Sequence, residues 1–168
     1  MYKDDIEDME QQQPLREGDI APDFTSSDSD GHSFKLSDFR RKKNVVVYFY
    51  PKDFTPGCTT EAIEFTKDYN KITDANIEII GVSPDTNDSH KKFRQKLNIP
   101  YLLSADTQNE TSKKYGVYGP KSFMGKKYMG VNRSTFLIDT NGKIIRIFSK
   151  VKPAGHSQEV IDSFRREN

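Results

Sequence analysis

The chain has 168 residues, the length of one domain, and we expect it to fold around a single core. Lys and Arg number 26 against 25 Asp and Glu, so the net charge of +1 argues against the strongly basic class of nucleic-acid-binding proteins. The longest apolar run, residues 45–50, falls far short of the roughly 20 residues that span a bilayer. We therefore expect neither a nucleic acid nor a membrane among its partners.

The N-terminal segment is acidic and rich in glutamine. Residues 1–13 contain five acidic side chains and one lysine, and they do not show the basic start and apolar stretch of a secretory signal. We expect residues 1–14 to form a flexible tail and residues 15–168 to form a single domain. The single cysteine excludes an internal disulfide, and a free thiol is most easily kept in a reducing compartment, so we expect a cytoplasmic protein.

The first half of the domain alternates strands and helices. Asp30-Gly31 lies between two short runs and predicts a tight hairpin near the N-terminus. Residues 45–50 are all β-branched or aromatic, which predicts a central strand, buried on both faces, in a mostly parallel sheet. Apolar residues then recur at spacings of three and four and predict one amphipathic helix that carries Ala62, Phe65, Tyr69 and Ile72.

The alternation continues in the second half. We expect a strand at 77–82, a helix that ends before Asn98, and a short strand at 101–104. Residues 116–132 hold four glycines and a proline, which predicts a long surface loop.

The C-terminal part predicts a hairpin and a helix. Asn141-Gly142 is a strong signal for the turn of a hairpin over residues 135–148, and Ser157 is expected to cap the last helix. Together the elements predict an α/β fold in which helices flank a mixed sheet, with an additional hairpin at the N-terminal end.

The one cysteine, Cys58, follows a Pro- and Gly-containing turn directly after the predicted central strand. An isolated cysteine is usually inert core packing. Here, however, Thr55 suits the N-cap and Pro56 the first position of a helix. That register places Cys58 among unpaired backbone N–H groups at the positive end of the helix dipole, an environment that stabilises a thiolate. The sequence therefore predicts a reactive cysteine.

The same residues carry a resemblance to a known family. PKDFTPGC, residues 51–58, has the PxxxTxxC arrangement of the peroxiredoxins, and YFYPKDFTPGCTTEA resembles their bacterioferritin-comigratory or Q-type subfamily. The resemblance continues in IIGVSPD at 79–85, KKYMGVNRSTFLID at 126–139 and GHSQEVID at 155–162. It implies a thioredoxin-like fold, no cofactor, and an antioxidant thiol peroxidase that reduces hydrogen peroxide and small organic hydroperoxides.

Residue by residue, the resemblance implies four roles. Cys58 would be the peroxidatic nucleophile that becomes a sulfenic acid, and Thr55 would hydrogen-bond the sulfur and the peroxide. Arg133 would hold the thiolate and the developing negative charge, and Pro51 would shield the thiolate from water. Arginine suits such a role because it stays charged when buried, although surface statistics alone favour a solvated charge at Arg133. Thr55 also fits a plain helix cap. For Glu61 two roles are open: it could order the pocket, or it could be an exposed acid in the first turn that interacts with the helix dipole.

The chain departs from the subfamily at the second cysteine. Many members carry a resolving cysteine five residues after the first, where this chain has Ile63, or in the next helix, and no second cysteine exists here. We expect thioredoxin, glutaredoxin or glutathione to resolve the sulfenic acid at Cys58, in a monomer or weak homodimer. The alternative from another class is a non-catalytic redox sensor or holdase that uses Cys58 stoichiometrically.

The remaining signals are weaker. His32, His90 and His156 are scattered without a second ligand at metal-binding spacing, so we expect surface histidines and no metal site. Residues 113–152 carry ten Lys or Arg against one acid, a charge of +9, whereas residues 1–13 sum to −4. The basic segment is either a solvated face or a surface that steers an acidic partner or glutathione.

Overall fold

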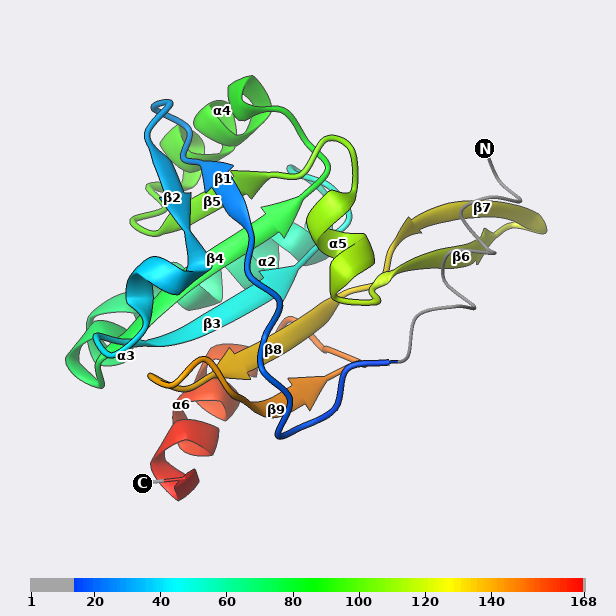
Figure 1. Ribbon diagram of the computed structural model, residues 1–168. Helices are drawn as coiled ribbons and strands as arrows, with labels where there is room; N and C mark the ends of the chain where they lie inside the picture. Colours follow the sequence, from blue (N-terminus) through cyan, green and yellow to red (C-terminus); the bar gives the residue numbers. More distant parts are fainter. Residues whose placement is uncertain (1–13, 168) are drawn as a thin grey trace.

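A five-stranded mixed sheet forms the centre of the structure (Figure 1). The computed structural model describes residues 14–167, so the expected tail lies outside the described residues except for Pro14. In spatial order the strands are β5 (Leu102–Ala105), β4 (Ile77–Ser83), β3 (Asn44–Phe49), β8 (Ser134–Ile138) and β9 (Ile144–Phe148). The pairs β5–β4 and β4–β3 are parallel, and the pairs β3–β8 and β8–β9 are antiparallel. The mixed sheet is confirmed, whereas the expectation of a mostly parallel sheet is wrong.

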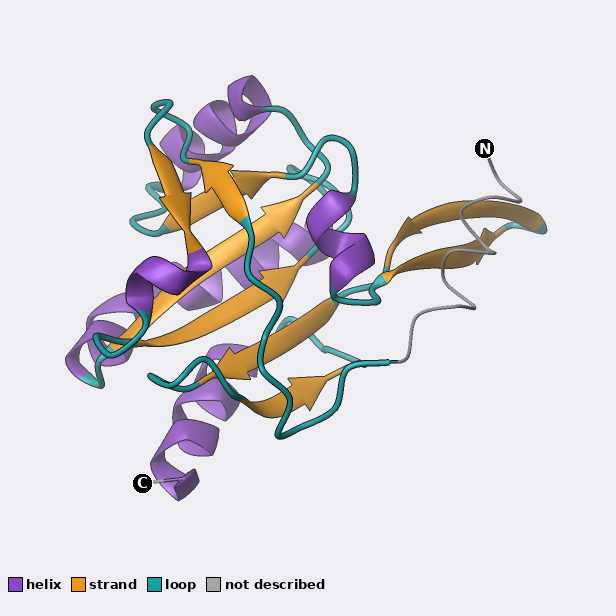
Figure 2. Cartoon of the chain, viewed as in Figure 1, coloured by secondary structure: helices purple, strands orange, loops and turns teal. Residues whose placement is uncertain are grey.

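Both faces of β3 are buried, as its uninterrupted apolar run predicted. Alternate side chains of the strand enter two cores on opposite faces of the sheet. The helices α2 (Pro56–Lys67), α4 (Asn87–Leu97) and α6 (His156–Glu167) contribute to one core. The other core is closed by the N-terminal segment and by residues next to the short helix α5 (Glu110–Lys114) (Figure 2).

The predicted hairpins at the two ends of the domain are present. Strands β1 (Thr25–Ser27) and β2 (Ser33–Lys35) pair antiparallel across the Asp30-Gly31 turn and lead into the short helix η1 (Leu36–Phe39). Strands β8 and β9 are joined through Asn141-Gly142, where Gly142 takes a φ of 80°. The central strand, its neighbours and both hairpins were therefore readable from residue pattern and turn chemistry.

The helix predicted after Cys58 is in fact two helices. It breaks at Asp68 between α2 and α3 (Tyr69–Asp74), and the Asp68 carboxylate accepts a hydrogen bond from Ser157 Oγ over 2.6 Å. Helix α6 begins at His156, so Ser157 lies inside the helix, and the expectation that it is the N-cap is wrong.

No helix among the described residues is long and apolar enough to cross a bilayer. The predicted apolar stripe is nevertheless correct, because Phe65 packs on Tyr48 with ring centroids 4.9 Å apart.

The expected loop at 116–132 is instead a hairpin of β6 (Tyr118–Phe123) and β7 (Lys126–Val131). Among the described residues these strands pair only with each other, and the hairpin projects from the body of the domain (Figure 1). Met124 and Gly125 both have positive φ, as a two-residue hairpin turn of type I′ requires. The prediction failed because a free-standing hairpin has little core to face and so shows no clear apolar alternation.

Candidate active site

Cys58 lies where helix α2 starts, at the carboxyl end of the central strand. Thr55 is the N-cap and Pro56 the first helical residue, so Cys58 falls in the first turn, as predicted. Its thiol is free, and the residue is 1% exposed. The backbone N–H groups of this turn have no intrahelical acceptor and create a positive potential around the sulfur. The sulfur is therefore buried at the positive end of the dipole of α2.

Arg133 reaches the same point from the start of the neighbouring strand β8. Because Phe49 pairs with Ser134, the residue just before β8 is brought next to the end of β3, where α2 begins. Arg133 Nη2 donates to Cys58 Sγ over 3.2 Å, and the side chain is 18% exposed. The alternative that Arg133 is a solvated surface charge is therefore wrong, because its guanidinium is largely buried and contacts the sulfur.

Glu61, one turn further along α2, completes the group. Its Oε1 accepts a hydrogen bond from Arg133 Nη1 over 2.7 Å, and the residue is fully buried, so of the two alternatives it orders the site. Its Oε2 has no hydrogen-bond partner among the described residues. Burial raises the pKa of Glu61 from 4.5 to about 7, although the positive charge of Arg133 opposes the increase.

The guanidinium of Arg133 is held as a cation between two acids. Burial by itself lowers the pKa of Arg133, but Glu61 and Cys58 raise it, and the net result is above its ordinary value. Arg133 therefore stays charged next to the sulfur. One cation is thus shared between the Cys58 thiol and the Glu61 carboxyl group.

Gly57 is a residue of the site that sequence reasoning missed. A Cβ built on Gly57 would lie 3.1 Å from Arg133 Nη2 and 3.8 Å from Pro153 Cγ. The missing side chain lets the guanidinium lie close to the start of α2 and reach Cys58. The motif contains this glycine, but only the three-dimensional structure shows what occupies the space next to it.

Thr55 and Pro51 lie on the wall of a cavity of about 570 Å³ beside Cys58. Cys58 itself is not on the wall, but its neighbour Gly57 and its partner Arg133 are. The Thr55 hydroxyl donates to the carbonyl oxygen of Lys52 over 2.7 Å. The resemblance implied a hydrogen bond between this hydroxyl and the sulfur, but the hydroxyl proton is directed at Lys52 instead. The remaining lining residues are Lys52, Pro84, Asn109, Tyr118, Lys121, Tyr128, Met129, Gly130 and Val131.

The wall of the cavity contains three cationic side chains, Lys52, Lys121 and Arg133, among apolar residues. Lys121 Nζ donates to the Val131 carbonyl oxygen over 2.9 Å, which points the ammonium group back along the hairpin. Burial lowers the pKa of Lys121, and the nearby charge of Arg133 lowers it further. A small polar molecule in this cavity thus lies among cationic side chains, beside the residues that flank Cys58.

Two of the three histidines are buried, which contradicts the expected surface positions. His90 lies in α4, where Nδ1 is 2.7 Å from Asp53 Oδ2 and Nε2 is 3.1 Å from the Ser104 carbonyl oxygen. His156 contacts Thr135 Oγ1 and Glu159 Oε1, each over 2.8 Å. Sequence reasoning missed them because isolated histidines carry no periodic signal, and only the fold supplies their partners.

Asp53 anchors the loop between β3 and α2. Tyr50 Oη donates to Asp53 Oδ1 over 2.7 Å, and Ser89 Oγ donates to Oδ2 over 2.9 Å. The Asp53 backbone N–H donates to Asp85 Oδ2 over 2.8 Å. These hydrogen bonds connect the segment that carries Pro51 and Thr55 to the start of α4. They therefore hold this part of the cavity wall in place.

The same network contains ligand-type groups, because Asp53, Asp85 and His90 offer atoms within 4.8 Å of one another. A metal ion would need a lone pair from the imidazole ring. His90 Nε2 lies 3.1 Å from a carbonyl oxygen, which can only accept, and Nδ1 lies 2.7 Å from Asp53 Oδ2, so both ring nitrogens already have hydrogen-bond partners. The group is therefore arranged as a hydrogen-bond network, and its residues do not fit a bound cation.

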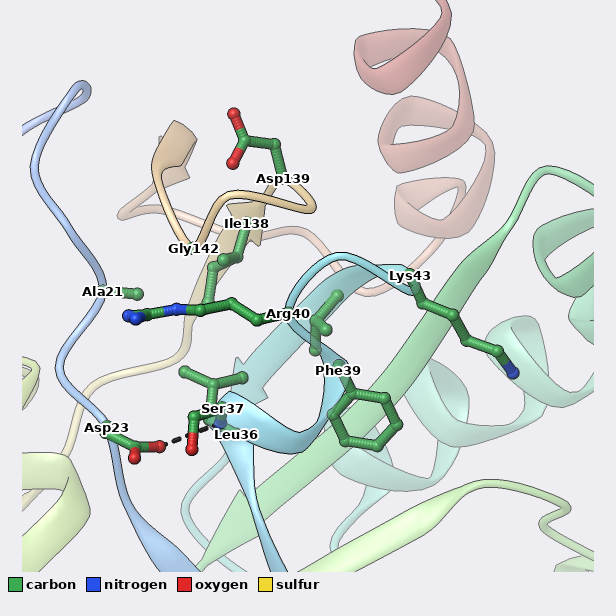
Figure 3. A pocket seen from close by; sticks show the side chains of 11 residues that line it. Ala21, Asp23, Leu36, Ser37, Phe39, Arg40, Lys43, Ile138, Asp139 and Gly142 are labelled. Atoms are coloured by element: carbon green, nitrogen blue, oxygen red, sulfur yellow. Dashed lines mark hydrogen bonds between the residues drawn. The ribbon is translucent and has the colours of Figure 1, made fainter.

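A second hollow lies at the opposite end of β3 (Figure 3). Arg40 extends between Ala21 and Gly142, and the Ser37 N–H donates to Asp23 Oδ1 over 3.0 Å (Figure 3). The hollow has a volume of about 10 Å³, which is roughly the space that one water molecule needs. This hollow is too small for a substrate and is remote from Cys58.

Comparison with known proteins agrees with this geometry. The AhpC/TSA family model matches residues 18–147. The chain is 43% identical over 148 residues to Peroxiredoxin Bcp of Bacillus subtilis (strain 168), covering 88% of this chain and 94% of the relative. A mutant structure of Xanthomonas campestris Peroxiredoxin Q superposes with a TM-score of 0.81 at 34% identity, covering 86% of this chain and 92% of that one.

A more distant solved structure is also similar. It is a yeast mitochondrial 1-Cys peroxiredoxin, with a TM-score of 0.78 at 26% identity, covering 90% of this chain and 75% of that one. The thioredoxin-like fold and the family expected from PKDFTPGC are thereby confirmed. The chain belongs to the AhpC/TSA family and is a peroxiredoxin of the Bcp and Q type, that is, a thiol peroxidase.

Proposed function

We propose that Cys58 is the peroxidatic cysteine of a one-cysteine cycle that an external thiol completes. The observation that carries the proposal is the hydrogen bond of 3.2 Å from Arg133 Nη2 to Cys58 Sγ, next to a cavity of about 570 Å³. A fixed cation, a helix N-terminus and a partly enclosed cavity are the conditions under which a thiolate acts as a nucleophile.

The first step is a displacement at oxygen. The Cys58 thiolate attacks one oxygen of the hydroperoxide, the S–O bond forms, and the O–O bond breaks. The leaving oxygen departs as hydroxide or alkoxide and takes up a proton to become water or an alcohol. The sulfur is oxidised to a sulfenic acid while the peroxide is reduced.

Arg133 is the main electrostatic group in this step. Negative charge moves from the sulfur onto the leaving oxygen, and a preorganised donor in a partly buried site stabilises charge that develops in the transition state. The Thr55 hydroxyl donates to Lys52, which leaves its oxygen lone pairs to accept a hydrogen bond from the peroxide O–H. Pro51 lies on the cavity wall, where its ring limits the access of water to the sulfur.

An external thiol must complete the cycle, because Cys58 is the only cysteine in the sequence. Ile63, at the position of the second cysteine in many relatives, is 49% exposed. One thiol attacks the sulfenic acid, a mixed disulfide forms and water leaves; a second thiol then releases Cys58 as a thiol. The yeast 1-Cys relative is described with the glutathione and thioredoxin systems, which supports glutathione, glutaredoxin or thioredoxin as the reductant here.

The cavity sets the scale of the substrate. Its volume of about 570 Å³ admits hydrogen peroxide and small organic hydroperoxides, and its positive lining suits polar or anionic molecules. We infer a monomer or weak homodimer in a reducing compartment such as the cytoplasm, where a single free thiol persists.

Trapping of the oxidised cysteine tests the cycle. Protein treated with one equivalent of peroxide and a sulfenic-acid reagent should carry the adduct on Cys58, and addition of glutathione should give a mixed disulfide there by mass spectrometry. The Cys58→Ser variant is the matched control. Absence of both products from the wild-type protein would contradict the proposal.

A further inference from the structure

We propose that the turn of the β6–β7 hairpin docks on anionic lipid bilayers by inserting Phe123 and Met124 into the interface. This peripheral contact differs from the spanning segment whose absence led us to expect no membrane partner. It adds a location to the proposed function and does not change the chemistry at Cys58.

The turn exposes large apolar side chains where the fold does not need them. Phe123 is 67% exposed and Met124 is 87% exposed, the highest values among the exposed large hydrophobic residues of the described part. Met124 also has a φ of 50°, at a turn position where Asn, Asp or Gly fits better. Neither hydration nor backbone geometry favours a methionine here, so folding alone does not explain this turn.

Positive charge accompanies the apolar turn. Lys126 pairs with Phe123 across the hairpin, Lys127 pairs with Ser122, and both lysines are exposed. From residue 113 to residue 138 the sequence contains no acidic residue. Apolar side chains at a tip flanked by lysines match the interface of an anionic bilayer, since the acyl region takes the apolar groups while the ammonium groups stay with the phosphates.

The shape of the hairpin favours a bilayer over a folded protein partner. β6 and β7 pair with no other described strand, and the ribbon projects from the domain with its turn outermost (Figure 1). A convex tip needs a matching pocket to bind a protein tightly, because binding energy concentrates in buried central contacts. A fluid lipid interface has no such requirement.

The base of the same hairpin lines the cavity beside Cys58. Tyr118, Lys121 and Tyr128 belong to β6 and β7 and face the cavity that Arg133 also borders. A docked turn would therefore hold the cavity near the membrane surface. The proposed peroxidase reaction would then take place beside the bilayer surface, a step that rests on the proposed function.

Sedimentation with lipid vesicles tests the docking. The wild-type protein should bind vesicles of phosphatidylcholine with phosphatidylglycerol, bind vesicles of phosphatidylcholine alone weakly, and release at high salt. Phe123→Ser/Met124→Ser and Lys126→Glu/Lys127→Glu should each weaken binding by about tenfold or more. The matched controls are Ile20→Ser, at a residue that is 56% exposed, and Lys91→Glu/Lys92→Glu on α4, and both should bind like wild type.

Activity separates the docking from the peroxidase chemistry. With hydrogen peroxide in solution the Phe123→Ser/Met124→Ser variant should keep the wild-type rate, so that a loss of vesicle binding is distinguished from a loss of the fold or of the site at Cys58. Wild-type protein that does not sediment with anionic vesicles, or a variant that sediments equally well, overturns the docking. A wild-type protein that binds vesicles but consumes no hydrogen peroxide overturns only the proposed function.

Discussion

Arg133 and Cys58 are 75 positions apart in the chain, and Arg133 Nη2 donates a hydrogen bond to Cys58 Sγ over 3.2 Å. The contact exists because β3 and β8 are neighbours, so that the residue before one strand meets the helix that follows the other. The same guanidinium binds the buried carboxyl group of Glu61. The proposed reactivity of Cys58 therefore depends on a guanidinium that Glu61 also holds.

Removal of the guanidinium should slow the first chemical step. In Arg133→Met, we expect the second-order rate constant of Cys58 with hydrogen peroxide to fall by about 100- to 1000-fold, the usual loss when a preorganised donor is removed. Stopped-flow kinetics measures it. Arg133→Met/Glu61→Gln is the control, because it avoids an unpaired buried carboxylate. A rate within about twofold of wild type in the folded double variant would show that Arg133 does not assist.

Glu61 should make stability depend on pH. The pKa of Glu61 is about 7 in the folded protein and about 4.5 in the unfolded chain. At a pH between these two values the folded protein therefore keeps a proton that the unfolded chain has lost. The stabilisation is present below about pH 4.5 and is lost as the pH rises through about 7.

The Glu61→Gln variant isolates this effect. Relative to wild type, its free energy of unfolding should increase by up to about 3 kcal/mol between acidic pH and pH of about 8. Urea unfolding at several pH values measures the difference, with Glu64→Gln on the same helix as control. A pH-independent difference between Glu61→Gln and wild type would be incompatible with the raised pKa.

Gly57→Ala should separate stability from activity. Alanine favours a helix over glycine by up to about 1 kcal/mol, so the thermal midpoint should hold or rise. The new Cβ, 3.1 Å from Arg133 Nη2, should displace the guanidinium and lower the peroxide rate by about tenfold. The exposed neighbour Thr60→Ala is the comparison. An undiminished rate in Gly57→Ala would mean that the position of the guanidinium is not critical.

His90→Ala should strongly destabilise the protein. It leaves the buried carboxyl group of Asp53 without its imidazole partner, and a buried hydrogen-bonding group that loses its partner typically costs about 1–3 kcal/mol. Chemical unfolding should show this loss, and His32→Ala, at an exposed histidine, should change stability by less than about 0.5 kcal/mol. Equal small effects of both substitutions would argue that the Asp53–His90 pair does not secure the loop.

Local signals predicted most of the fold and the centre of the site. Three predicted features depend only on residues that are neighbours in the chain, and such local patterns can be read from the sequence. They are the buried run at 45–50, the Asn141-Gly142 turn and the helix start at Thr55-Pro56. The family motif added Arg133, whose contact with Cys58 depends on sheet topology rather than on spacing in the chain.

The missed features depend on distant packing or on its absence. His90 is buried because Asp53 and Ser104 meet it in space. The hairpin at 118–131 pairs only with itself among the described strands, so it shows no core-facing pattern. The role of Gly57 arises from the guanidinium beside it, 76 positions further along the chain.

Peroxide turnover per subunit tests the central claim most directly. With excess glutathione, glutaredoxin or thioredoxin and its reducing system, we predict that each wild-type subunit consumes many equivalents of hydrogen peroxide, while Cys58→Ser consumes none above background. Arrest after a single equivalent with every reductant, or equal consumption by Cys58→Ser, would contradict catalysis through this cysteine.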